Sequence, residues 1–203
     1  MIKRSWILIA VVLFWLTGPS WANAVPKRPM QTLEEPFNHI ITVLNDPAYR
    51  NPEKKTLQRD KIWEIARPVF DFDEISRRAI GKSWNTFTPD EKKRFTSIFS
   101  EFLGSTYIDK LQGGYHNEKI DFDKELVRGD KALVRTRVRS ETAEIPIDYR
   151  MQQVDGVWKV YDILVDNGVS IVKNYYVQFN SMLREGTPAQ LIERLEKKLD
   201  IKN

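Results

Sequence analysis

The chain has 203 residues, of which 30% are charged, with a formal net charge of +4 and no cysteine. A charge so close to balance argues against the concentrated basic face of a nucleic-acid-binding protein. The lack of cysteine excludes disulfides, thiol nucleophiles and thiolate metal ligands, so the fold must depend on its apolar core.

The first residues have the organisation of a cleavable signal peptide. Lys3 and Arg4 give a basic start, residues 7–16 form an unbroken apolar run, and Ala22-Asn23-Ala24 supplies a small-x-small cleavage pattern. The apolar run is shorter than the stretch of about 20 residues that a membrane-spanning helix needs. We therefore predict a signal peptide over 1–24, export of the chain, and a mobile leader without periodic structure over 25–35.

Four helices are predicted next because apolar residues recur there at helical spacing. They are expected over residues 36–44, 51–66, 72–80 and 89–112. Pro36 is placed at the first helical position, where a missing N–H costs nothing. Thr88-Pro89-Asp90-Glu91 combines a cap, a helix-opening proline and a returning carboxylate. In the helix that follows, the apolar stripe drifts past Gly104, which predicts a bend there.

An antiparallel meander of about four strands is predicted after these helices. The strands are expected around residues 120–122, 131–140, 145–153 and 157–165. Asp155-Gly156 supplies the last tight turn, since both residues tolerate a positive φ.

Two closing helices are predicted within 168–199, separated by Gly186-Thr187-Pro188. Helices gathered before a run of antiparallel strands are typical of the α+β class, with helices over one face of the sheet. Residues 36–199 are therefore predicted to form one domain, with a helical part over 36–112 and a sheet within 118–166.

The chain lacks the residue patterns of common active sites. Its two histidines, His39 and His116, have no partner at metal-ligand spacing, and no common hydrolase or nucleotide-binding motif is present. The acidic clusters around Asp71 and Asp121 are better explained as charges at a helix start and on the wet face of a strand. The sequence therefore gives little support to catalysis, and no metal or cofactor is predicted.

For one carboxylate, that of Asp162, the sequence supports a specific hypothesis. The alternation along 157–165 predicts it on the same inward face as Trp158, which is expected to be structural. A buried carboxylate needs partners, and hydroxyls such as that of Ser170, Tyr149 or Tyr175 could supply them. Anchoring of the following helix is the favoured role. The alternative is a base in an NTF2-like enzyme acting on a small apolar substrate.

Arg135, Arg137 and Arg139 alternate along one strand and are predicted to face away from the core. Such a row forms either an ordinary solvated face paired with acidic residues or a site for phosphate headgroups or an acidic partner.

On their inward faces, the predicted sheet and helices present a surplus of large apolar side chains. From pattern alone these side chains either fill a core, as in a pure interaction module, or line an apolar pocket.

Several separated blocks of the sequence resemble the MlaC family of periplasmic phospholipid carriers, also called toluene-tolerance auxiliary proteins. They are FDFDEISRRAIGKSWNTFTPDEKKRF at 70–95, FSEFLGSTYIDKL at 99–111, IPIDYRM at 145–151, VWKVYDILVD at 157–166 and NGVSIVKNYYVQF at 167–179. The resemblance implies an NTF2-like twisted antiparallel sheet under helices, with an apolar pocket between them that takes the acyl tails of a phospholipid.

The resemblance also implies a place in the cell and a set of partners. They are the Gram-negative periplasm, an MCE-domain subunit of an inner-membrane ABC transporter and an outer-membrane lipoprotein–porin complex. A monomeric carrier moving phospholipid between these complexes would maintain the lipid asymmetry of the outer membrane. A family branch tied to hopanoid synthesis makes a hopanoid-type lipid the alternative ligand.

Given the resemblance, the apolar surplus is predicted to be the wall of the lipid pocket. The predicted lipid-binding residues are Phe70, Ile75, Phe95, Phe99, Phe102, Val134, Val138, Ile147, Tyr149, Met151, Val160, Val172, Tyr175 and Phe179. The arginine row of Arg135, Arg137 and Arg139 is the predicted headgroup or partner site.

Overall fold

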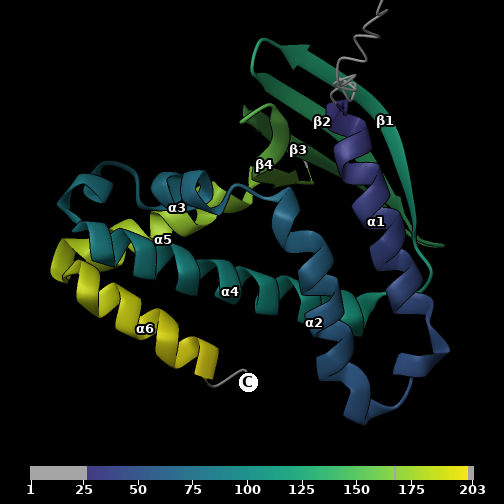
Figure 1. The fold of residues 1–203 in the computed structure, drawn as a ribbon, viewed down its shortest axis with the longest axis horizontal. Coiled ribbons are helices and arrows are strands. Elements are labelled where there is room, and N and C mark those ends of the chain that lie inside the picture. Colours follow the sequence, from purple (N-terminus) through teal and green to yellow (C-terminus); the bar gives the residue numbers. More distant parts are fainter. Residues whose placement is uncertain (1–26, 167, 201–203) are drawn as a thin grey trace, which may run out of the picture.

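The structure is a computed structural model that describes residues 27–166 and 168–200 (Figure 1). The predicted signal peptide lies outside the described residues. Helices precede an antiparallel sheet and two helices follow it, as the α+β class requires.

Helix α1 spans Pro29–Asn45 and begins earlier than Pro36, the predicted start. The leader prediction is therefore wrong for residues 29–35, which are helical. The cause is tertiary: the carboxylate of Glu125 accepts a hydrogen bond from the backbone N of Met30 at 2.9 Å, and Leu33 is fully buried. Pro36 consequently lies inside the helix rather than at its first position.

Three further helices follow, with short 3-10 turns between them. Their bounds are α2 Lys55–Ala66, α3 Phe72–Ile80 and α4 Pro89–Gly114, and the 3-10 turns are η1 Pro47–Tyr49, η2 Pro52–Lys54, η3 Arg67–Val69 and η4 Gly81–Thr86. The predicted caps are present: Asp71 accepts from the backbone N of Glu74, and Thr88 and Glu91 form a reciprocal capping box. These local signals fix where α3 and α4 begin because they satisfy backbone donors that have no partner within the helix.

The sheet is an antiparallel meander with strands in sequence order. Its strands are β1 Lys119–Arg128, β2 Lys131–Arg139, β3 Glu144–Val154, β4 Val157–Val165 and β5 Val169–Ser170. The two-residue β5 makes five strands rather than about four. Asp155 and Gly156 both have positive φ, as predicted for the turn between β3 and β4.

Helices α5, Ile171–Glu185, and α6, Pro188–Asp200, complete the fold. Figure 1 shows α3, α4, α5 and α6 gathered beside the sheet, while α1 lies across it. One buried core is formed by the gathered helices, and a second by the sheet with α1 and η3. Phe70 joins the two, because it packs against both cores and forms a bridge to Val160 of β4.

Candidate functional site

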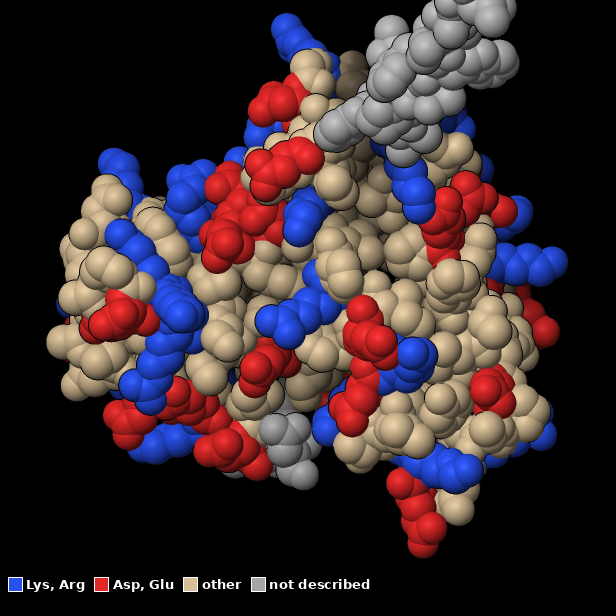
Figure 2. All heavy atoms as spheres, viewed as in Figure 1, with Lys and Arg blue, Asp and Glu red and all other residues tan. Residues whose placement is uncertain are grey.

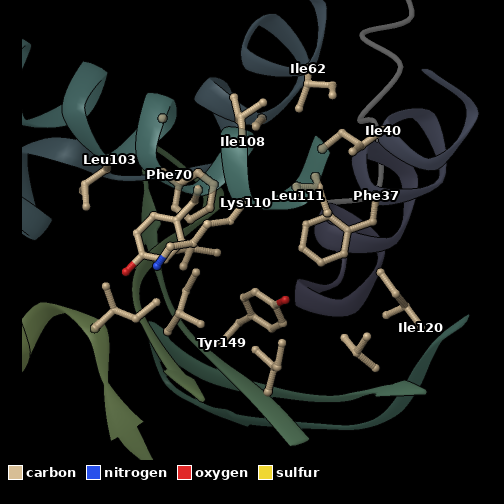
Figure 3. A pocket seen from close by; sticks show the side chains of 18 of the residues that line it. Phe37, Ile40, Ile62, Phe70, Leu103, Ile108, Lys110, Leu111, Ile120 and Tyr149 are labelled. Atoms are coloured by element: carbon tan, nitrogen blue, oxygen red, sulfur yellow. The ribbon is translucent and has the colours of Figure 1, made fainter. Parts of the chain in front are cut away.

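An apolar cavity of about 540 Å³ lies among α1, α2, α4 and the sheet (Figure 3). Its volume is within the range of about 300–1,000 Å³ that is usual for ligand sites. Nearly all the side chains that line it are aliphatic or aromatic. A site of this composition binds by burial of apolar surface, with few groups able to perform chemistry.

Helix α1 contributes one wall through residues at helical spacing. Phe37, Ile40, Ile41 and Leu44 all line the cavity, and Figure 3 shows Phe37 directed towards Tyr149 of the sheet. The two rings meet edge to face with centroids 5.5 Å apart. This geometry is favourable for aromatic pairs and holds α1 over the sheet without filling the space beside it.

Helices α2 and α4 form the opposite wall and cross closely at one glycine. A Cβ at Gly104 would lie 2.8 Å from two carbon atoms of the Trp63 ring. Both residues line the cavity. The glycine therefore lets the indole of Trp63 lie flat against α4, at a distance that no other residue would allow.

The sheet supplies the floor of the cavity through Val138, Ile147, Tyr149 and Val160. Tyr149 is only 6% exposed, and its hydroxyl is hydrogen-bonded to Thr136. Burial raises the pKa of Tyr149, so the phenol stays neutral. The floor therefore offers one satisfied hydroxyl in an otherwise apolar surface.

Asp162 also borders the cavity, but its oxygens already have partners. They accept hydrogen bonds from Ser170 Oγ at 2.9 Å and from the backbone N of Val172 at 3.3 Å, and they pair with Arg150 at 3.2 Å. The residue lies on the inward face of β4 with Trp158 and Val160, as the alternation predicted. A register shift in the pairing of β3 with β4 places it opposite Arg150. The carboxylate, 5% exposed, holds the start of α5 and has no free oxygen to act as a base.

Half of the predicted lipid-binding residues border the cavity. They are Phe70, Ile75, Val138, Ile147, Tyr149, Val160 and Val172.

The other half of the predicted set lies elsewhere in the molecule. Phe95, Phe99, Phe102, Tyr175 and Phe179 pack together between α4, α5 and α6, where the last two, with Phe102, border a separate cavity of about 250 Å³. Val134 and Met151 are fully buried in the sheet core with Trp158. Periodicity identifies an inward face, but it does not distinguish a face that meets a neighbouring side chain from one that borders open space.

The predicted arginine site is occupied by acidic side chains of the same sheet. Arg137 pairs with Asp123 at 2.7 Å and with Glu144 at 2.9 Å, and Arg139 pairs with Asp121 at 2.6 Å. Arg135 lies 3.3 Å from Asp148. The hydrogen bonds from Arg137 lower the pKa of Asp123, so the pairs stay charged at neutral pH.

Acidic and basic side chains are similarly interspersed over the face seen in Figure 2. The arginine row is therefore a charge-compensated outer surface of the sheet and does not line the cavity.

Several cavity residues were not among the predicted ones. Those on the helices include Phe37, Ile40, Ile41, Leu44, Ile62, Trp63, Leu103, Tyr107, Ile108, Lys110 and Leu111. The apolar stripe of α1 and the drift of the stripe past Gly104 in α4 are the signals that could have identified them. Past Gly104, α4 turns its apolar side chains from the helical core to the cavity.

Within residues 27–166 and 168–200, none of the helices combines the length and the apolar character needed to span a bilayer. In the same residues, no cluster of three or more histidine, aspartate and glutamate side chains has an arrangement that could hold a metal ion.

Comparisons with known proteins give a consistent picture. The family model described as MlaC protein matches residues 34–197. A toluene tolerance protein, ttg2D, from Pseudomonas putida is 30% identical over 131 residues, which cover 63% of this chain and 60% of that protein. A phospholipid-binding protein from Ralstonia solanacearum, solved in complex with a phospholipid, has a similar fold, with a TM-score of 0.72 and 20% identity over 87% of this chain and 99% of the other.

Proposed function

Because the chain belongs to the MlaC family, we propose that it is a periplasmic carrier that holds a phospholipid by its acyl tails in the apolar cavity. It passes the lipid between an MCE-domain subunit of an inner-membrane ABC transporter and an outer-membrane lipoprotein–porin complex. This exchange contributes to the lipid asymmetry of the outer membrane.

The apolar cavity is the observation that carries this proposal. Burying a methylene is worth about 0.8 kcal/mol, so two tails of roughly 30 carbons in all would gain about 24 kcal/mol relative to water. This exceeds the practical limit of about 18–21 kcal/mol for non-covalent affinity, and the lipid starts in a bilayer that is equally apolar. The cavity therefore has to match a membrane rather than surpass it, and transfer depends on the partner proteins.

Two other functions fit the structure less well. An enzyme using Asp162 as a base would need a free carboxylate oxygen, whereas Ser170, Val172 and Arg150 all bind this group. A pure interaction module would close its apolar residues into a dry core, whereas about 540 Å³ remains open. A hopanoid-type ligand is the alternative within the family, and the identity of the lipid extracted from the protein decides it.

The test is to fill the cavity floor and measure uptake of a phospholipid with a fluorescent tail. Ile147→Trp places an indole in space that the tails need, whereas Val127→Trp makes a similar change at a site on β1 that is 53% exposed. Excluding about two methylenes lowers affinity by about tenfold. We expect this loss for Ile147→Trp and uptake like that of the wild type for Val127→Trp. Equal uptake by both folded variants would place the tails elsewhere.

A further inference from the structure

Few charged side chains line the cavity, and they differ in whether they have hydrogen-bond or ion-pair partners. Three charged side chains line it, those of Asp162, Glu118 and Lys110. Asp162 is bound by its three partners, and Glu118 accepts a hydrogen bond from the backbone N of His116 at 2.7 Å. Among the residues the structure describes, no carboxylate lies within ion-pair distance of the Lys110 ammonium, whose contact is with the ring of Tyr107, 5.4 Å away.

Lys110 lies where the cavity meets water. The residue is exposed, as is Tyr107, one helical turn before it on α4, which is 38% exposed. Figure 3 shows the Lys110 side chain among the apolar side chains that line the cavity. A lysine placed in this way packs its methylene stem against apolar surface and keeps its ammonium in water. The position is therefore one where a ligand with an apolar body would present its polar end.

Resting on the proposed carrier function, we infer that Lys110 is the contact for the negatively charged phosphate of the bound lipid. A phosphodiester is a strong acceptor, and a lysine binds phosphate as a flexible point charge that tolerates different headgroup shapes. The Lys110 ammonium lies over the ring of Tyr107, which also lines the cavity. The hydroxyl of Tyr107 is hydrogen-bonded to Tyr175, and burial raises the pKa of Tyr107, so the ring brings no competing negative charge.

The arginine row cannot serve this purpose in the same way. Arg135, Arg137 and Arg139 are all paired with carboxylates and none of them lines the cavity. A lipid phosphate there would have to displace an existing partner and would lie away from its own tails. Lys110 meets both conditions, a position on the cavity lining and an ammonium without a carboxylate partner among the described residues.

The experiment compares two lipids that differ only in the phosphate headgroup. Delipidated full-length protein is incubated with vesicles that contain equal amounts of a phosphatidylcholine and the diacylglycerol with the same tails, and the bound lipids are quantified by mass spectrometry. We expect the wild type to be enriched in the phospholipid. Lys110→Met should lower the ratio of phospholipid to diacylglycerol by about three- to tenfold, as loss of a partly exposed charge contact predicts.

Two matched variants serve as controls. Lys93→Met removes a charge from an exposed site of the same helix that does not line the cavity, and should leave the ratio unchanged. Lys110→Arg keeps the charge and should retain most of the preference. Because Lys110 is exposed, both of its variants should fold like the wild type, which the thermal midpoint of unfolding verifies.

The possible results separate this inference from the carrier function. An unchanged ratio in Lys110→Met overturns the role of Lys110 while leaving lipid binding intact. Failure of the wild type to take up either lipid overturns the carrier function and this inference with it. Calorimetric titration with inorganic phosphate should give no binding heat; saturable binding that Lys110→Met abolishes would reassign Lys110 to free phosphate and overturn the headgroup role.

Discussion

Replacing Gly104 by alanine tests the crossing of α2 and α4 that shapes one wall of the cavity. The added Cβ would lie 2.8 Å from Cε3 and from Cζ3 of Trp63 and 3.1 Å from Cδ2. The indole is a rigid ring that also packs against Phe72, with centroids 5.5 Å apart. Relief of the clash therefore requires the whole ring or the helix to move.

The magnitude follows from two opposing effects. Alanine gains about 0.8–1 kcal/mol over glycine inside a helix, whereas inserting a methyl group into a packed interior costs about 1–3 kcal/mol. We expect a net loss of up to about 2 kcal/mol in the free energy of unfolding. In a domain of this size the thermal midpoint then falls by up to about 8 °C.

Gly113→Ala is the matched control on the same helix. Apart from the neighbouring backbone of α4 itself, no atom lies within 4 Å of a Cβ built at Gly113, so only the gain in helix propensity remains. This variant should be slightly more stable than the wild type when both are followed by circular dichroism during heating. A Gly104→Ala protein as stable as Gly113→Ala would refute the close approach of Trp63 to α4. Displacement of Trp63 should also reduce phospholipid uptake, because both residues line the cavity.

Two further predictions concern buried charge and pH. Asp162→Asn keeps the side-chain shape but weakens the bonds to Ser170, Val172 and Arg150, and should lower the free energy of unfolding in urea by about 1–3 kcal/mol; a change below about 0.5 kcal/mol would contradict the anchoring role. For Glu74, hydrogen bonding from Arg77 is the main cause that lowers its pKa from the ordinary value of 4.5, with Arg78 adding to it. The ionised Glu74 therefore stabilises the folded protein fully above pH 4.5, and this stabilisation is lost as the pH falls through the lower folded-state pKa. Glu74→Gln should consequently be less stable than the wild type at neutral pH, and the difference should shrink in acid. A difference that does not depend on pH would disprove the assignment.

The fold was largely predictable because its boundaries are set by local signals. Thr88 with Glu91, Asp71 and the Asp155-Gly156 turn each satisfy or bend the backbone using only nearby residues. The start of α1 was missed because Glu125, far away in the sequence, supplies the contact to the backbone of Met30. No pattern in residues 29–35 alone reveals that partner.

The candidate site was only partly predictable, because its residues share their pattern with the core. Along α4, Phe99 meets other rings of the helical core, whereas Ile108, farther along, faces the cavity. Both belong to apolar stripes, and the difference arises from what the other helices place opposite them.

Native mass spectrometry of the protein purified from the periplasm tests the central claim most directly. We expect a population whose mass exceeds that of the chain by one phospholipid, which disappears on delipidation and returns on incubation with vesicles. Ile147→Trp should reduce this population, whereas Val127→Trp should not. A protein that carries no lipid and takes none up from vesicles, although folded, would contradict the account.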